Sequence, residues 1–258
     1  MRDYWILSLE TSPDTEAALA TSLYRHPCLG LESEREGKRV RIRAYFSGEF
    51  PVTALRGELQ QQFSEVQWLA ATRIGLPDGS DRSGEIREVS LAGKEFRLDC
   101  GPAFGTGAHT TTQLAAELMA KTCLKERAVL DLGTGSGILA ILAKALGAAK
   151  VEAVEILPEA RENARGNFER NGVGEISLHA RMEEVVVRFD IIVANLLAPI
   201  LLQLRGAILE RLAPEATLIL SGILESEKAS VLEAFSPGRL VAELRREGWM
   251  GFCLSYPK

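Results

Sequence analysis

Apolar and polar positions follow two different patterns along the chain, and the change between them falls near residue 100. The first part predicts four short strands and two helices in the order β-α-β-β-α-β, which is that of a ferredoxin-like unit. The strands are expected at residues 4–10, 28–33, 38–46 and 66–71, and the helices at residues 12–24 and 55–63. These elements predict a small α+β domain over residues 1–73.

A segment rich in Gly, Ser, Asp and Pro follows at residues 74–87, and this composition is typical of a linker or a long loop. Two short strands, at residues 89–91 and 95–98, then predict a small hairpin. We place the domain boundary here, with residues 74–100 as linker and hairpin. The second domain is expected over residues 101–258.

From residue 109 onward, apolar strands alternate with helices, which indicates a parallel sheet covered on both faces. Only residues 246–249 separate the last two strands, so these strands predict an antiparallel hairpin at the sheet edge. The strands are expected at residues 128–131, 151–155, 176–179, 191–194, 217–220, 239–245 and 250–256, and the helices at residues 109–122, 138–146, 158–171 and 200–212. The fold class is therefore α/β, with a seven-stranded Rossmann-like sheet after the α+β domain.

Composition and charge narrow the possible partners. Hydrophobic residues make up 46% of the chain and charged residues 25%, which is typical of a folded globular protein. Lys and Arg number 13 against 16 Asp and Glu in residues 1–100, and 17 against 19 in the rest, so we expect no direct nucleic-acid partner. The chain has neither a signal-peptide pattern nor an apolar run of about 18 residues, which favours a cytoplasmic protein without a membrane partner. The four cysteines form no Cys-x-x-Cys pair, so no metal site is expected.

The most specific segment is an apolar strand followed by a glycine-rich turn and the start of a helix. The turn contains Gly133, Gly135 and Gly137, which let a ligand approach the backbone while the helix N-terminus supplies N–H donors. A dinucleotide fingerprint has its third glycine at the position of Ile138, so a pyrophosphate is not favoured. Asp131 precedes the turn and would repel a phosphate, but it suits a ligand with an ammonium group.

Glu155 ends the next strand, 22 residues after Gly133. An acidic side chain at this place can accept hydrogen bonds from both hydroxyls of a ribose, although an ordinary charged strand end is the alternative. Asp131, the glycine turn and Glu155 together describe a nucleoside that carries a cationic amino-acid tail, and S-adenosylmethionine is that molecule. The antiparallel terminal hairpin is also what the common methyltransferase fold adds to a Rossmann-like sheet.

Three further segments carry a family likeness. Residues 103–112 read Ala-Phe-Gly-Thr-Gly-Ala-His-Thr-Thr-Thr, residues 194–196 read Ala-Asn-Leu, and residues 221–224 read Ser-Gly-Ile-Leu. With the Asp-Leu-Gly-Thr-Gly-Ser-Gly turn, they resemble the ribosomal protein L-eleven methyltransferase family (PrmA type). That family carries Ala-Phe-Gly-Thr-Gly-x-His-x-Thr-Thr, Asp-x-Gly-x-Gly-Ser-Gly and Ala-Asn-Leu/Ile. The likeness covers roughly residues 100–256.

The resemblance implies an enzyme that transfers methyl groups from S-adenosylmethionine to lysine or N-terminal amines of a ribosomal protein. It implies cofactor contacts by Thr112, Gly133, Glu155 and Asn195, and family members usually carry Asp where this chain has Glu155. The whole cofactor site is expected to comprise Phe104, Gly105, Thr106, Gly107, Thr112, Asp131, Gly133, Gly135, Gly137, Glu155 and Asn195.

Two residues are candidates for the catalytic step. Asn195, with the carbonyls of Leu196 and Leu197, could hold an amine so that its lone pair faces the methyl group. His109 could act as a general base, or its ring could make a hydrogen bond that stabilises the loop. Both roles of His109 stay open at this point.

The substrate is open as well, because the likeness weakens before residue 100, and that part of the family recognises the ribosomal protein. One alternative keeps the methyl transfer and changes the target to another protein or a small amine. Another is a regulator that binds the cofactor without turnover. The alternating strand with Arg39, Arg41 and Arg43 on one face could dock a polar partner or could be a solvated outer face.

Overall fold

The computed structural model describes residues 3–26, 28–47, 49–75, 86–99 and 107–258. The chain forms two compact units, residues 1–82 and residues 83–258. Among the described residues, no helix is both long enough and apolar enough to cross a bilayer.

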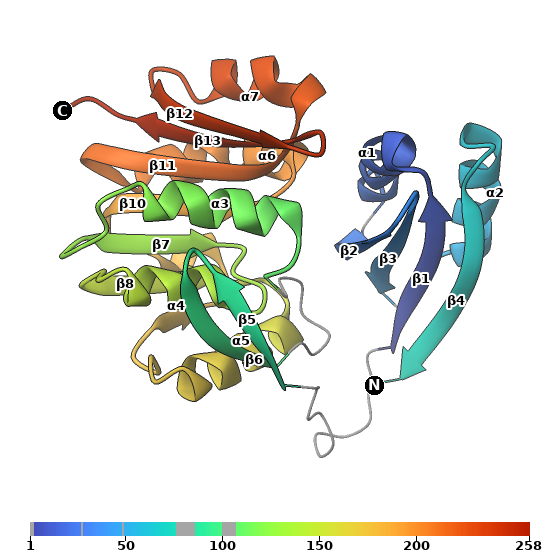
Figure 1. Cartoon of the computed structure of the whole chain (residues 1–258), viewed down its shortest axis with the longest axis horizontal. Helices are drawn as coiled ribbons and strands as arrows, with labels where there is room; N and C mark the ends of the chain where they lie inside the picture. Colours follow the sequence, from blue (N-terminus) through green and yellow to red (C-terminus); the bar gives the residue numbers. More distant parts are fainter. Residues whose placement is uncertain (1–2, 27, 48, 76–85, 100–106) are drawn as a thin grey trace. The chain divides into compact units, whose positions relative to one another are not determined.

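The first unit is a four-stranded antiparallel sheet with two helices (Figure 1). Its elements are β1 (Asp3–Thr11), α1 (Pro13–Tyr24), β2 (Cys28–Glu36), β3 (Arg39–Ser47), α2 (Val52–Gln62) and β4 (Gln67–Gly75). The strands lie in the order β2-β3-β1-β4. Both helices contribute to one apolar core with the sheet, which includes Leu7 of β1, Leu19 of α1 and Leu55 of α2.

The basic strand β3 alternates as its sequence predicts. Val40 and Ile42 are buried in the core of the first unit, whereas Arg39 and Arg43 are exposed. The strand does not carry an isolated positive charge, because Arg39 forms an ion pair with Glu10 of β1. The register also places Glu10 beside Arg41.

The second unit is built on a seven-stranded sheet in the order β12-β13-β11-β10-β7-β8-β9. Strand β13 runs antiparallel to its two neighbours, and the other pairs are parallel, so the α/β class and the terminal hairpin are confirmed. Its elements are β5 (Ile86–Leu91), β6 (Lys94–Asp99), α3 (Thr110–Ala120), β7 (Ala128–Leu132), α4 (Ile138–Ala145), β8 (Lys150–Val154), α5 (Pro158–Arg170), β9 (Ser177–His179), β10 (Phe189–Asn195), α6 (Ala198–Glu210), β11 (Leu212–Leu224), α7 (Lys228–Ala234), β12 (Arg239–Arg246) and β13 (Trp249–Ser255). Helix α7 was not predicted.

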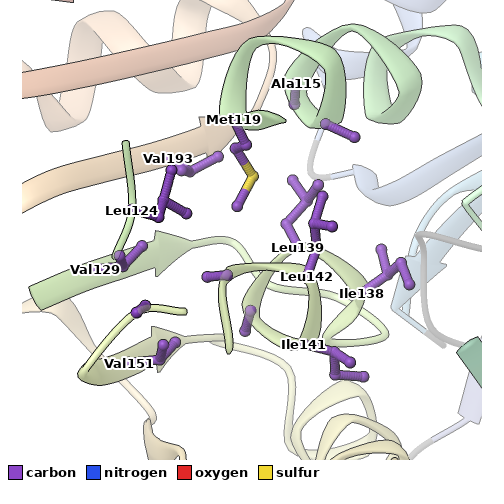
Figure 2. Close-up of a cluster of buried hydrophobic side chains, with 14 of the residues drawn as sticks. Ala115, Met119, Leu124, Val129, Ile138, Leu139, Ile141, Leu142, Val151 and Val193 are labelled. Carbon is purple, nitrogen blue, oxygen red and sulfur yellow. The ribbon is translucent and has the colours of Figure 1, made fainter. Parts of the chain in front are cut away.

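Alternate residues of the central strands supply two separate cores, one on each face of this sheet. Helices α3, α4 and α5 cover one face, and α6 and α7 cover the other (Figure 1). Figure 2 shows part of the first core, where Met119 of α3 and Leu142 of α4 lie near Val129, Val151 and Val193 of three neighbouring strands. Burial on both faces explains why these strands are almost entirely apolar.

The small hairpin of β5 and β6 is part of the second unit. Leu91, Phe96 and Leu98 of the hairpin belong to the same core as α4 and α5. The hairpin that the sequence grouped with the linker is therefore packed against the sheet domain, and its strand β6 lies along α5.

Candidate functional site

The carboxyl ends of the parallel strands bring the predicted site residues to one edge of the sheet. Strand β7 lies between β8 and β10, and the last paired residue of β7, Leu132, lies beside Val154 and Ala194. Gly133 and Glu155 therefore follow neighbouring strands. Ligands of open α/β sheets bind at this edge.

The glycine turn is held by hydrogen bonds from its own amides. Gly133 and Thr134 both donate to the carbonyl of Val154, over 2.9 and 3.0 Å. Gly133, Gly135 and Gly137 have φ angles of +75°, +54° and +88°, in the region that favours glycine. The turn is therefore a defined structure that needs all three glycines.

Two of these glycines also lie close to neighbouring side chains. A Cβ atom on Gly133 would lie 2.5 Å from Cδ2 of Leu196, and one on Gly137 would lie 2.5 Å from Cε1 of Phe168. The turn thus packs tightly against the loop after β10 on one side and against α5 on the other.

Asp131 lies at the end of β7, and its side chain is almost completely buried, at 2% exposure. Its Oδ2 accepts hydrogen bonds from the hydroxyl of Thr134 and from the amide of Ala140 in α4. Its Oδ1 has no partner among the described residues. Burial raises the pKa of this carboxyl to about 7, and the neighbouring Glu155 adds to the rise.

Glu155 directly follows β8, and its carboxylate is turned into the glycine turn. Its Oε2 accepts from the amide of Gly135, and its Oε1 accepts from the amide of Leu157, both over 3.0 Å. Burial raises the pKa of Glu155, and these backbone hydrogen bonds oppose the rise. A carboxylate has about four acceptor sites, and the amides of Gly135, Ile156 and Leu157 occupy three of them, so capacity remains for a ligand's hydroxyl.

Thr112 and Asn195 meet although they come from distant parts of the chain. The side-chain amide of Asn195, at the end of β10, donates to the hydroxyl of Thr112 in the first turn of α3 over 3.2 Å. Ser221 of β11 supports the same contact, because its hydroxyl donates to the carbonyl of Thr111 and its own carbonyl accepts from the amide of Leu196. The first turn of α3 is thereby tied to two strand ends.

His109 stands at the N-cap position of α3, and its Nδ1 accepts a hydrogen bond from the amide of Thr111. Its ring also meets the ring of Trp249 edge-on, with 5.7 Å between the centroids. Burial lowers the pKa of His109 to about 4, so the ring is neutral near pH 7. The stabilising hydrogen bond, one of its two predicted roles, is present; its role as a base stays a prediction.

The remaining predicted residues belong to the segment before α3. Phe104, Gly105 and Thr106 lie outside the described residues. Gly107 is described, with φ at +79°, and its carbonyl accepts from the side chain of Gln113 over 2.6 Å. A Cβ on Gly107 would lie 2.5 Å from Cγ1 of Val89 in the hairpin.

Sequence reasoning missed two buried residues that shape this edge. The sequence pattern gives Ser221 no role beyond the family likeness, although this residue bridges α3 and the loop after β10. Asn167 of α5 is fully buried and donates to the carbonyl of Ser136 in the glycine turn over 2.9 Å. The signal for Asn167 was the spacing of asparagines 163, 167 and 171, four residues apart along a helix.

Comparison with known proteins finds one family by both the family model and individual relatives. The family model described as ribosomal protein L11 methyltransferase (PrmA) matches residues 86–256. A ribosomal protein L11 methyltransferase of Citrifermentans bemidjiense is 40% identical over 171 residues, which cover 63% of this chain and 55% of that protein. One of Deinococcus radiodurans is 36% identical over 242 residues, which cover 88% of this chain and 87% of that protein.

A solved structure extends the similarity to the fold. The ribosomal protein L11 methylase of Lactobacillus delbrueckii subsp. bulgaricus superposes with a TM-score of 0.60 at 37% identity, over 63% of this chain and 86% of that one. The chain spans about half the length of the first of these relatives and most of the Deinococcus protein. By its matched residues and its sheet, the chain belongs to the ribosomal protein L11 methyltransferase family.

Proposed function

We propose that the protein transfers methyl groups from S-adenosylmethionine to amines of a ribosomal protein. The observation that carries this proposal is the buried edge of the sheet, where a glycine turn lies between two acidic side chains, those of Asp131 and Glu155. A family relationship over two thirds of the sequence supports it.

The residues present fit this cofactor in charge and hydrogen-bonding capacity. The unpartnered Oδ1 of Asp131 is a buried acceptor suited to the ammonium group of a methionine tail. Glu155 offers an acceptor for a ribose hydroxyl, and the glycine turn provides backbone with no side chain to exclude the ligand. We propose that Thr112 and Asn195 complete the site, together with Gly107.

When bound, the cofactor supplies a methyl group on a positively charged sulfur, which needs no further activation. The chain must then orient the attacking amine. We propose that Asn195, which is hydrogen-bonded to the hydroxyl of Thr112, orients the amine together with the carbonyl of Leu196. The expected role of Leu197 is not kept, because its carbonyl already accepts the amides of Ile200 and Leu201 at the start of α6. A lysine must arrive neutral, and burial in an apolar site lowers the pKa of its ammonium.

We assign His109 to the structure of the loop rather than to proton transfer. Its Nδ1 already accepts the amide of Thr111, and a pKa of about 4 makes the ring a weak base at neutral pH. The amine would release its proton to solvent as it leaves water for the buried site, and no protein base is assigned.

The substrate is proposed to be ribosomal protein L11, which the names of the relatives specify, and such a substrate would place the reaction in the cytoplasm. Selection of this substrate is assigned to residues 1–73, because the proposed cofactor contacts all lie beyond residue 100. Another protein or a small amine is the runner-up target.

Incubation of the full chain with purified ribosomal protein L11 and methyl-labelled S-adenosylmethionine tests the function. Label should enter lysine or N-terminal amines of the protein, and the Glu155→Ala variant should transfer far less. A fragment of residues 83–258 should bind the cofactor and lose this transfer. If label instead enters another component of a cell extract while L11 stays unlabelled, the substrate assignment is wrong.

A further inference from the structure

Side-chain amides of α5 bind the outer edge of the β5–β6 hairpin. Among the described residues, β5 is the one strand that pairs with β6, so the outward backbone groups of Arg97 and Asp99 need other partners. The side chain of Asn171 accepts a hydrogen bond from the amide of Arg97 over 3.0 Å and donates one to the carbonyl of Arg97 over 2.8 Å. Asn167 does the same for Asp99, at 2.8 and 3.3 Å.

Asn167 differs from Asn171 because it also reaches the glycine turn. Its Nδ2 donates to the carbonyl of Ser136 over 2.9 Å, and the side chain is 0% exposed. On the other side of that peptide bond, the amide of Gly137 donates to the carbonyl of Thr134 over 2.8 Å. The Ser136–Gly137 peptide is thus held at both its carbonyl and its amide.

The next residue of α5 reinforces this contact. The ring of Phe168 lies so close to Gly137 that a Cβ there would be 2.5 Å away. Asn167 and Phe168, consecutive residues of α5, therefore contact the second half of the turn. Glu155 accepts a hydrogen bond from the amide of Gly135 in the middle of the turn. A buried amide is costly to leave unpaired, so the orientation of Asn167 is fixed by partners on both sides.

We propose that Asn167 is a positioning residue that couples the β5–β6 hairpin to the cofactor site by fixing the Ser136–Gly137 peptide of the glycine turn. This inference rests on the proposed function, because it takes the turn to be the place where S-adenosylmethionine binds. The hairpin is then a structural support of that site rather than part of a linker.

Asn167→Ala and Asn171→Ala form a matched pair in the full-length protein. Each variant removes one asparagine that pairs with β6, but only Asn167→Ala removes the contact with Ser136. Calorimetric titration with S-adenosylmethionine should show at least a tenfold weaker Kd for Asn167→Ala and a change within twofold for Asn171→Ala. Denaturant unfolding measures how far each change destabilises the fold.

A kinetic measurement separates positioning from general destabilisation. In Asn167→Ala the KM for S-adenosylmethionine should rise while the KM for the protein substrate stays unchanged. If the wild type binds the cofactor and Asn167→Ala binds it within twofold, the inference is wrong and the proposed function stands. Equal losses in both variants would also contradict it. A wild type that does not bind the cofactor would remove the proposed function and this inference together.

If Asn167→Ala does not fold, amide hydrogen exchange in the wild type tests the coupling between the hairpin and the cofactor site. The amide of Asp99 donates to Asn167, and the amide of Arg97 donates to Asn171. Adding S-adenosylmethionine should slow exchange at the Asp99 amide about tenfold more than at the Arg97 amide. Equal slowing at both amides would contradict the coupling.

Discussion

The side-chain amide of Asn195 donates a hydrogen bond to the hydroxyl of Thr112 over 3.2 Å, across 83 positions of the chain. The contact joins the end of β10 to the first turn of α3. It brings together two residues that the family resemblance assigns to the cofactor, and it lies at the edge where β7 and β8 also end.

Replacing Thr112 by Val keeps the shape of the side chain and removes the acceptor. Thr112 is itself a proposed cofactor contact, and one hydrogen bond contributes about 0.5–1.5 kcal/mol, so we expect S-adenosylmethionine affinity to fall roughly twofold to tenfold. Thr122→Val is the control, because Thr122 lies just past the far end of α3, where its side chain bonds the carbonyl of Leu118 and Cys253. Calorimetry that gave the same affinity for both variants would argue against a role of Thr112.

Glu155→Ala should weaken cofactor binding without unfolding the protein. The lost charge-assisted hydrogen bonds correspond to about 1.5–3 kcal/mol, or roughly tenfold to a hundredfold in Kd. Glu152→Ala is the matched control, since Glu152 is a buried acid of β8 that pairs with Lys150 and His179 rather than with the turn. It should lower the free energy of unfolding and leave Kd unchanged. Unchanged affinity in Glu155→Ala would remove Glu155 from the site.

Gly133→Ala should destabilise the turn more than its backbone conformation alone explains. Gly133 and Gly172 have similar left-handed φ angles, +75° and +70°, and an alanine at either costs about 1–2 kcal/mol. Only the Cβ at Gly133 meets a neighbour, Cδ2 of Leu196, whereas nothing lies within 4 Å at Gly172. Denaturant unfolding should therefore show a larger loss for Gly133→Ala, and equal losses would mean that Leu196 moves aside freely.

Stability without cofactor should fall as the pH rises toward 7, because of Asp131. Its pKa is raised from 3.8 to about 7, so its contribution is fully present below pH 3.8 and is lost as the pH rises through the folded value. The difference between the two pKa values corresponds to at most about 4 kcal/mol in the free energy of unfolding. Asp131→Asn should flatten this dependence of the unfolding free energy between about pH 4 and pH 7. Parallel curves for the two proteins would show that Asp131 titrates normally.

Cofactor affinity should depend on pH in the opposite sense. An ammonium group favours ionised Asp131, so binding releases a proton and the affinity of the wild type should increase from pH 5 to about pH 7. In Asp131→Asn, titrations over the same range should show little of this increase.

Sequence patterns predicted the sheet well because its strands are buried on both faces and are therefore almost purely apolar. Helix α7 was missed because its seven residues include one fully buried apolar residue, Val231, and carry no clear helical periodicity. Strand β11 runs from Leu212 to Leu224, well beyond the predicted residues 217–220. Its first part contains Pro214 and Glu215, which are unusual in a buried strand, so the pattern did not include it.

The sequence predicts that the site residues gather at one edge of the sheet, but it does not predict their side-chain partners there. Asp131, the glycines and Glu155 are recognisable because their spacing reflects a local strand–turn–helix unit. The contacts of Asn167 and Ser221 depend on how α5 and β11 pack against distant segments, and no local pattern encodes that packing.

Titration of the full chain with S-adenosylmethionine and, separately, with NADH tests most directly whether this edge of the sheet is the site of a methyl donor. We expect saturable binding of S-adenosylmethionine with one site per chain, a weaker Kd in Glu155→Ala, and much weaker binding of NADH. Tighter binding of NADH, or S-adenosylmethionine binding that Glu155→Ala leaves unchanged, would contradict this assignment.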